Sequence, residues 1–282
     1  MNQTFGPMGE LPRDFDAFQG TVKARRDALP KRLVQVADYA LQHPDEIAFG
    51  TVASIAAAAG VQPSTLVRFA HHFGFGGFSD MQSIFRDRLR NRNVSYEERI
   101  AILRGVAGGS PELAILNGFL EAASQSISKL PRRLDLNRFR AASKLLADAD
   151  TIYLIARRRS FPLTSYMAYG FGKMGIKAQL LGSPAGIDDE IVACATVADA
   201  AIAISFTPYA PETVRLTRAI ASRGVPVIAI TDSSFSAIVE HAAHWFEIAE
   251  DDFAGFRSLS ASMAFCMALT VAVADTRKND ME

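Results

Sequence analysis

The stretch Thr151–Pro162 reads TIYLIARRRSFP, and it decides the fold class of the sequence. Its first half, Thr151–Ala156, is an apolar run with the length and composition of a buried β-strand. Three arginines, Arg157 to Arg159, follow at once. Buried strands do not usually end in three adjacent cations, so this one is expected to end at a surface where the arginines face an anionic ligand, a nucleic acid or water.

Four further apolar runs follow in the same half of the chain and alternate with helical patterns. They read KAQLLG, AAIAISF, PVIAIT and HWFEIA, and they begin near residues 177, 200, 226 and 244. The spacing leaves room for one crossover helix between most of them, as parallel strands require. Residues 149–282 are therefore predicted to form an α/β domain with a five-stranded, parallel, doubly wound sheet of the flavodoxin-like type.

Residues 29–95 contain only short helical patterns. Within them Thr51 is expected to cap a helix and Gly60 to end it, while Pro63 stands at the first position of the next helix and Gly74 follows its last turn. These patterns predict an all-α bundle that includes a helix-turn-helix.

Two segments flank this bundle. Residues 1–28 combine glycine, proline and mixed charge without a sustained period, and are expected to be loose. Residues 96–148 are expected to form a helical linker and the start of the second domain, with helices over about 111–130 and 135–149. The chain is thus predicted to have two domains.

The composition limits the possible functions. Lys+Arg and Asp+Glu both number 30, so the binding of a nucleic acid needs a local basic patch. Cys194 and Cys266 belong to no Cys-x-x-Cys or Cys/His cluster, which suits a reducing cytosol and predicts neither a metal site nor a cofactor. The most apolar segment, Met263–Ala274, is shorter than the ~20 residues of a membrane-spanning helix, so a buried helix in a cytoplasmic protein is expected.

The helix that begins at Pro63 has two faces of different character. Its apolar face carries Leu66, Phe69, Ala70 and Phe73. The polar residues expected on the opposite face are Ser64, Thr65, Arg68, His71 and His72. Hydroxyls, an arginine and histidines on an exposed helix are typical of a recognition helix in the major groove, where Arg68 can pair with guanine or phosphate. The alternative is a helical bundle whose polar side chains are only solvated.

The next helical pattern ends in a run of arginines. They are Arg86, Arg88, Arg90 and Arg92. They could form a strip that faces DNA phosphates, or simply a solvated helix end.

The segment Ile55–Gln82 resembles the N-terminal domain of RpiR/MurR-type bacterial transcriptional regulators. The positions that match the family pattern are Ile55, Ala56, Gly60, Val61, Thr65, Arg68, Phe69, Gly74, Phe75, Gly77 and Phe78. One departure is Gln62, which stands where the family has a serine that caps the recognition helix. The resemblance implies binding of double-stranded operator DNA. The expected DNA-binding residues are Gln62, Ser64, Thr65, Arg68, His71 and His72.

The same resemblance implies that the second domain is a sugar isomerase (SIS) domain, which binds phosphosugars. The segment that begins at Ala156 lies where the family has Gly-x-Gly-x-Ser; Ser160 matches the serine, whereas Ala156 and Arg158 replace the glycines. Loss of these glycines is expected to remove the freedom to adopt positive φ. A second Ser-rich loop is matched by Ser205 and Thr207.

In an open parallel sheet, ligands bind beyond the carboxyl ends of the strands. The expected ligand-binding residues are Arg158, Arg159, Ser160, Ser183, Ser205, Thr207 and Thr231. Pro208 removes an N–H group from the second loop, whereas guanidinium groups can replace N–H donors toward phosphates or carboxylates. The alternatives are that the hydroxyls cap helices, and that some arginines lie at the surface or in a subunit contact. Three outcomes are therefore open: the domain binds a phosphosugar, another small anion or no ligand.

These features predict a DNA-binding transcriptional regulator, a homodimer or homotetramer, whose SIS-like domain senses a sugar phosphate or another small anionic metabolite. The alternative is a sugar-phosphate isomerase, which needs a general base. The candidates for that base are Glu190, Glu212, Glu240 and His241. His241 and His244 have no cysteine nearby and predict no metal site.

Overall fold

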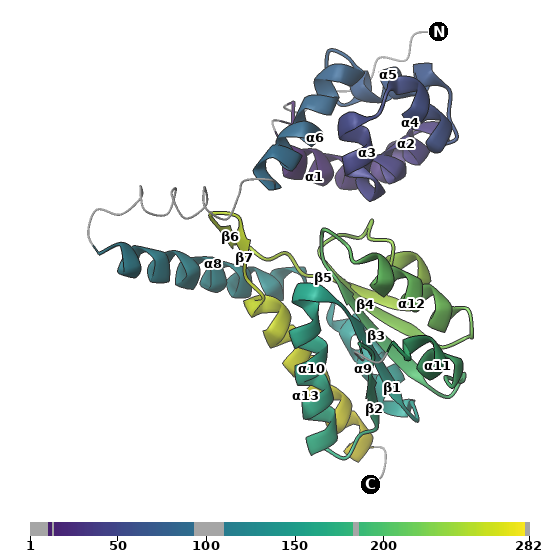
Figure 1. The fold of residues 1–282 in the computed structure, drawn as a ribbon, viewed down its shortest axis with the longest axis vertical. Coiled ribbons are helices and arrows are strands. Elements are labelled where there is room, and N and C mark those ends of the chain that lie inside the picture. Colours follow the sequence, from purple (N-terminus) through teal and green to yellow (C-terminus); the bar gives the residue numbers. More distant parts are fainter. Residues whose placement is uncertain (1–10, 13, 93–109, 183–185, 280–282) are drawn as a thin grey trace. The chain divides into compact units, whose positions relative to one another are not determined.

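The computed structural model describes residues 11–12, 14–92, 110–182 and 186–279. The chain divides into two compact units, residues 1–102 and 103–282 (Figure 1). Most of the expected linker before residue 110 and the expected ligand residue Ser183 lie outside the described residues.

The described part of the first unit is helical, as predicted. Its helices are α1 (Phe15–Arg25), α2 (Lys31–Gln42), α3 (Pro44–Phe49), α4 (Val52–Ala58), α5 (Pro63–His72) and α6 (Phe78–Arg92), with a 3-10 turn at Arg26–Ala28. Thr51 caps α4 in a reciprocal pair with Ser54, and Pro63 begins α5. Pro44 begins the short α3, which the sequence did not predict.

The expectation that residues 1–28 are loose is wrong for α1. Asp14 caps this helix by accepting a hydrogen bond of 2.8 Å from the N–H of Ala17. Phe18 is completely buried, with its ring centroid 5.5 Å from that of Phe73 and 5.4 Å from that of Phe85. The apolar positions of α1 are few and widely spaced, so their helical period is visible only once the partner rings are in place.

Replacement of Phe18 by alanine is expected to lower the free energy of unfolding of the first unit by about 3–5 kcal/mol, because it leaves a cavity among aromatic rings. Phe49→Ala is the matched control, since that side chain is 78% exposed and should change stability by less than about 0.5 kcal/mol. Urea denaturation followed by circular dichroism measures the effect. The only tryptophan, Trp245, lies in the second unit, so its fluorescence should report an unchanged transition.

The second unit contains the predicted five-stranded parallel sheet. Its strands are β1 (Ile152–Ala156), β2 (Ala178–Leu180), β3 (Ala200–Ser205), β4 (Val227–Thr231) and β5 (His244–Glu247). They lie in the order β2-β1-β3-β4-β5, the arrangement of a flavodoxin-like sheet. Strand β1 is buried on both faces because β2 and β3 flank it and helices cover it above and below.

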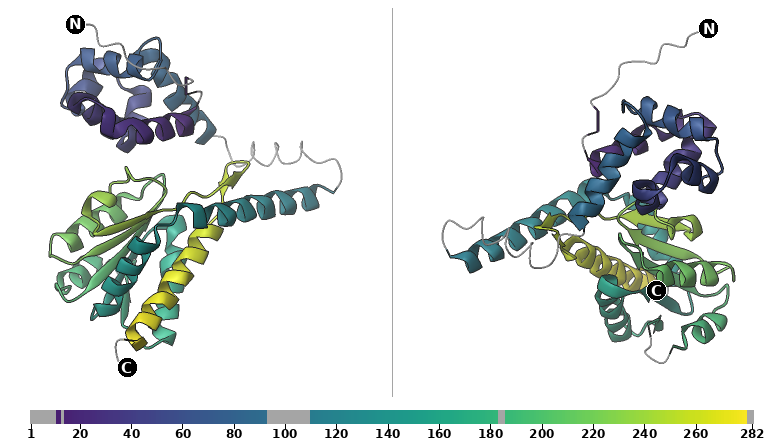
Figure 2. Two further views of the ribbon diagram at one scale, coloured as in Figure 1. Left: turned by 180° about the vertical axis from the view of Figure 1, so that it is seen from behind. Right: turned by 45° about the horizontal axis from the view of Figure 1, so that its top comes forward.

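Helices cover both faces of this sheet (Figure 1, Figure 2). One face, which includes Leu154, packs on α9 (Leu136–Asp148), α10 (Phe161–Lys173) and α13 (Ser260–Asn279). The other face, which includes Ile155, packs on α12 (Pro211–Ala221) and the short α11 (Asp188–Ala193). Neighbouring residues of β1 thus face opposite layers, which is why the whole run is apolar.

The most apolar segment of the sequence forms part of α13, as expected of a buried helix. Phe265, Cys266, Leu269 and Val273 enter the core beside the sheet. Among the helices that the structure describes, none has the length and apolar character needed to span a membrane.

Helix α8 (Pro111–Arg133) packs against a small antiparallel hairpin, β6 (Asp252–Phe253) and β7 (Phe256–Arg257). The ring of Phe119 lies with its centroid 5.5 Å from that of Phe253. A hairpin with two residues per strand has no periodicity that a sequence can display, so it was not predicted.

Candidate DNA-contacting helix and anion-binding edge

The first candidate site is the exposed face of α5. Ser64, Val67, Arg68 and His71 are exposed and follow the i, i+3, i+4, i+7 spacing of one helix face. The turn before α5 contains Gly60 with a φ of 64°, and the side-chain amide of Gln35 donates a hydrogen bond of 2.9 Å to the carbonyl oxygen of Ala59. This face is thus presented by a turn that α2 holds in place.

One of the residues expected on this face lies elsewhere. Thr65 is only 4% exposed, because it stands one helical turn before the buried Phe69, so its assignment to the exposed face is wrong. His72 is partly exposed; burial lowers its pKa, with a further contribution from the charge of Arg25. Gln62 is exposed, and its side chain makes no capping hydrogen bond to α5.

Val67 is a member of the exposed face that the sequence analysis missed. Its side chain is 37% exposed on the same side as Arg68. A valine in a helical pattern normally indicates a buried position, so the sequence did not mark Val67 as exposed. An apolar side chain in the major groove can, however, contact the methyl group of thymine.

Two of the four arginines in the possible strip on α6 are engaged within the first unit. Arg86 donates hydrogen bonds to the carbonyl oxygen of Ala48 at 3.0 Å and to Gln82. Arg88 pairs with Asp45 at 3.0 Å and lies over the ring of Phe15. These two arginines hold α6 to other helices, and the side chains of Arg90 and Arg92 lie outside the described residues.

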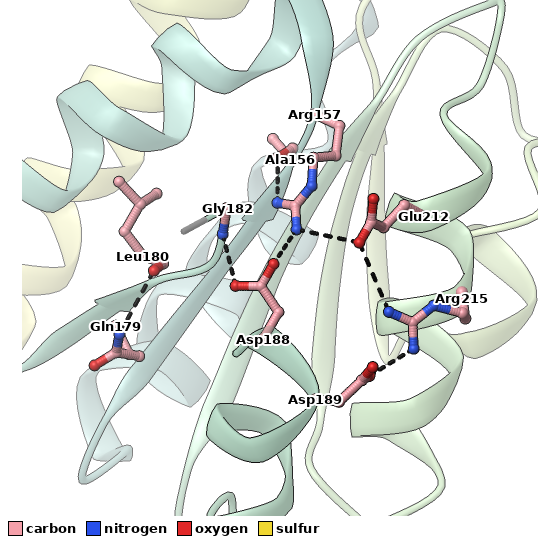
Figure 3. Close-up of polar contacts among 9 residues, drawn as sticks. All are labelled: Ala156, Arg157, Gln179, Leu180, Gly182, Asp188, Asp189, Glu212 and Arg215. Atoms are coloured by element: carbon pink, nitrogen blue, oxygen red, sulfur yellow. Dashed lines mark hydrogen bonds and ion pairs between the residues drawn. The ribbon is translucent and has the colours of Figure 1, made fainter. Parts of the chain in front are cut away.

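The second candidate site is the edge of the sheet where β1, β3 and β4 end. Here the three arginines have different surroundings. Arg157 forms a buried ion pair with Asp188, which is 5% exposed, and it approaches Glu212 at 3.7 Å. Figure 3 shows the guanidinium of Arg157 between these two carboxylates, while Arg215 links Glu212 to Asp189. The charge of Arg157 is thus neutralised within the protein.

The Arg157 side chain also lies against Gly182, whose N–H donates a hydrogen bond of 2.9 Å to Asp188. A Cβ atom on Gly182 would lie 2.9 Å from Nη1 of Arg157 and 2.8 Å from the ring of Phe161, and its φ is 128°. The glycine is therefore required where β2 ends, because the arginine occupies the space beside it.

Arg158 is exposed and has a φ of 56°. This is the left-handed conformation that glycine adopts without strain. The expectation that loss of the family's glycine removes this conformation is wrong. The backbone retains it because the 3-10 turn Arg158–Ser160 has to lead from β1 into α10, and the arginine tolerates the strain.

Arg159 is partly buried and forms no ion pair with a carboxylate of the described residues. Its guanidinium carbon lies 5.2 Å from the ring centroid of Phe206, and its Nη1 is buried without a hydrogen-bond partner. Burial lowers the pKa of Arg159, and Arg257 lowers it further, whereas Asp232 and Glu250 raise it. An arginine remains charged under these conditions, so it can attract an anion.

The expected hydroxyl residues lie at the same edge. Ser160, Ser205 and Thr231 are buried at the ends of their strands or directly after them, and Ser205 pairs in register with Thr231. The N–H of Thr207 donates to Asp232 at 2.9 Å, and its carbonyl oxygen accepts from Arg257 at 2.8 Å. Thr207 is thus tied to its neighbours through its backbone.

The structure also brings residues to this edge that the sequence did not indicate. Thr213 lies in the first turn of α12 and is completely buried, while Glu250 and Arg257 come from the segment after β5. No local motif marks them, since only the sheet order brings the segment after β5 to the end of β1. The expected general bases are not brought together: Glu190 and Glu240 are exposed, and His241 lies 3.4 Å from Arg218.

Replacement of Arg158 by glycine is expected to raise the free energy of unfolding of the second unit by about 1 kcal/mol, because glycine adopts positive φ without strain. The matched control is Arg158→Ala, which removes the same side chain but retains the strained backbone and should not stabilise. Urea denaturation followed by the fluorescence of Trp245 measures both. Equal effects of the two variants would contradict the assignment of backbone strain.

A helix-turn-helix unit followed by a parallel α/β unit defines a two-domain class of proteins, and sequence comparison identifies the family. Residues 19–92 match the helix-turn-helix domain of the rpiR family, and residues 145–273 match the SIS domain. The chain therefore belongs to the RpiR-type proteins, in which these two domains are joined.

Two known proteins are similar to most of this chain. An uncharacterized HTH-type transcriptional regulator of Haemophilus influenzae is 25% identical over 215 residues, which are 76% of this chain and 74% of that protein. A bifunctional protein glk of Burkholderia mallei is 26% identical over 218 residues, which are 76% of this chain but 32% of that protein. The chain thus spans about a third of the length of these glk proteins.

Solved structures share the fold. The Vibrio vulnificus NanR protein, complexed with ManNAc-6P, superposes with a TM-score of 0.54 and 18% identity, and the match covers 93% of this chain and 91% of that chain. The sugar isomerase domain of an RpiR transcription factor from Sphaerobacter thermophilus has a TM-score of 0.54 and 21% identity over 58% of this chain and 91% of that chain.

Proposed function

We propose that this protein is a transcriptional regulator that binds operator DNA through α5 and a small anionic metabolite through its SIS domain. The observation that carries the proposal is the exposed face of α5 within a unit that matches the rpiR helix-turn-helix domain. Arg68 and His71 supply charge or hydrogen bonds to phosphates and base edges, and Ser64 lies at the helix N-terminus near the DNA backbone.

The metabolite would bind where β1, β3 and β4 end. The residues proposed to contact it are Arg158, Arg159, Ser160, Ser183, Ser205, Thr207 and Thr231. Support comes from the buried hydroxyls and the unpartnered Arg159 at this edge, and from the sugar phosphate ManNAc-6P in the NanR complex. A sugar phosphate or another small anion would change DNA binding if its affinity differs between two arrangements of the DNA-binding domains.

The protein would act in the cytoplasm. It would bind DNA as a homodimer or homotetramer, because a single recognition helix contacts only a few base pairs. Apolar side chains on α8 support self-association. Leu113, Leu116 and Leu120 are each more than half exposed, an unusual density of large apolar groups for the free surface of one helix.

We infer that the protein is not a sugar-phosphate isomerase. Of the four candidate bases, Glu212 is the one placed near the strand ends, and it lies between Arg157 and Arg215 at 3.7 Å from each. These two ion pairs engage its carboxylate within the protein, so it is not a free base facing a substrate carbon. Incubation of the protein with aldose and ketose phosphates tests this inference, and turnover would contradict it.

Arg68→Ala is expected to weaken operator binding by about 5- to 150-fold, equivalent to ~1–3 kcal/mol, if Arg68 pairs with guanine. If it contacts a phosphate, the salt dependence of binding should decrease by about one unit of slope. Fluorescence anisotropy with a labelled fragment of the protein's own promoter, at several salt concentrations, measures both.

The matched control is Arg132→Ala, which removes one exposed cation from the second unit. It should leave both affinity and salt slope unchanged. If Arg68→Ala binds the promoter like the parent protein, α5 is not the helix that enters the groove.

A further inference from the structure

Buried polar groups without a partner gather at one edge of the sheet. Among the described residues, six side chains have a buried polar atom that lacks a hydrogen-bond partner. Five of these lie at or after the carboxyl ends of the strands; they are Arg159, Thr213, Thr231, Ser236 and Glu250. An unpaired buried polar group costs about 1–3 kcal/mol, so this concentration indicates a site made to bind a polar ligand.

Two of these groups are complementary. Nη1 of Arg159 can only donate a hydrogen bond, whereas Oε2 of Glu250 can only accept one. Both atoms lie at the carboxyl ends of the strands, and the charge of Glu250 raises the pKa of Arg159, so the two groups are within electrostatic range, yet no ion pair joins them. The other carboxylate oxygen of Glu250 is already occupied, since it accepts hydrogen bonds of 2.7 Å from the N–H and the hydroxyl of Ser262. A ligand that satisfies both free atoms must offer an acceptor to Arg159 and a donor to Glu250, and an anionic group is the acceptor that binds a guanidinium most strongly.

The other two charges near Arg159 are engaged with the protein. Asp232 accepts a hydrogen bond from the N–H of Thr207, and Arg257 lies 3.7 Å from Asp232 and donates to the carbonyl oxygen of Thr207. The two arginines and two carboxylates of this cluster sum to a formal charge of zero. Within this cluster the guanidinium of Arg159 is therefore the one left for an anion, and two carboxylates would repel a second negative charge on it.

A singly charged carboxylate fits this balance better than a phosphate that carries up to two charges. The loops around Arg159 offer few other groups that could stabilise the second negative charge of a phosphate. Pro208 has no N–H to donate, and Arg157 is neutralised by Asp188. The hydroxyls of Thr213 and Thr231 can both donate and accept, which suits the hydroxyl groups of a ligand.

We propose that this edge of the SIS domain binds a hydroxylated carboxylate of the sugar-acid class, with its carboxylate on Arg159 and one of its hydroxyls donating to Oε2 of Glu250. The proposal rests on the proposed function, in which the domain senses a small anion. It specifies that the anion is a carboxylate and that Glu250 accepts a hydrogen bond from the ligand.

The first experiment compares two matched series of probes on the full-length protein. Sugar acids (D-gluconate, D-galactonate, D-glucuronate and D-glycerate) are tested beside D-glucose 6-phosphate, D-galactose 6-phosphate, glycerol 3-phosphate and inorganic phosphate. At least one sugar acid should raise the Tm of the second unit, as ligand binding to the folded state requires, and its phosphorylated counterpart should bind at least tenfold more weakly. Trp245 fluorescence follows the transition, and titration calorimetry gives the Kd.

The second experiment uses three variants. Arg159→Gln should weaken binding of the best sugar acid by at least tenfold. Glu250→Gln retains an oxygen that can accept from Ser262, and it should weaken the sugar acid while strengthening the matched sugar phosphate, because the repelling charge is gone. Arg218→Gln is the matched control, since it changes an exposed arginine beside His241, before β5, and it should bind both probes like the parent protein. The Tm of each variant without a probe shows whether it folds.

The outcomes separate this proposal from the proposed function. Tighter binding of sugar phosphates than of sugar acids would overturn the carboxylate assignment and leave the anion sensor intact. Binding that is unchanged in Arg159→Gln and Glu250→Gln would overturn the roles of these residues. If no probe of either series shifted the Tm, the sensor role and the carboxylate assignment would both fail, whereas promoter binding would still support a DNA-binding protein.

Discussion

The organisation of the second unit depends on the complete burial of β1. The strand lies between β2 and β3 with helices on both of its faces, so the cations that follow it emerge at an edge of low dielectric. Each arginine there has a different environment. Arg157 is neutralised by Asp188, Arg158 reaches solvent through a left-handed backbone, and Arg159 lies against Phe206 with a donor unused. The charges of the edge thus separate into one that stabilises the fold and one that can attract a ligand.

A comparable division holds within the first unit, where the period of α5 separates the side chains that face the core from those that face solvent. Positions that follow the register of Phe69 turn toward the aromatic core around Phe18, and positions that follow Ser64 turn outward. Arg86 and Arg88 of α6 belong to the structural group, since they bind other helices. Basic residues near α5 are therefore not in themselves evidence of a phosphate-binding surface.

Much of the fold follows from local patterns. Alternating apolar runs and helical segments predicted the five strands, and Thr51, Pro63 and Gly60 marked the limits of α4 and α5. The elements that were missed, namely α1, α3 and the hairpin β6–β7, are short or weakly periodic and exist because of tertiary contacts such as those of Phe18 and Phe253. Thr65 was misplaced because one helical position separates a buried from an exposed side chain.

The sequence by itself determined the two-domain architecture, the parallel sheet and the helix that carries Arg68, because periodicity, caps and strand-length runs are local properties of the chain. It also indicated that polar groups would gather at the carboxyl ends of the strands. Only the tertiary structure decided which of three adjacent arginines has an unused donor, and that Glu250 and Arg257 lie near it. The physical reason is that a charge is neutralised or left available by residues distant in sequence, such as Asp188 and Asp232, which only the folded sheet brings to the same edge.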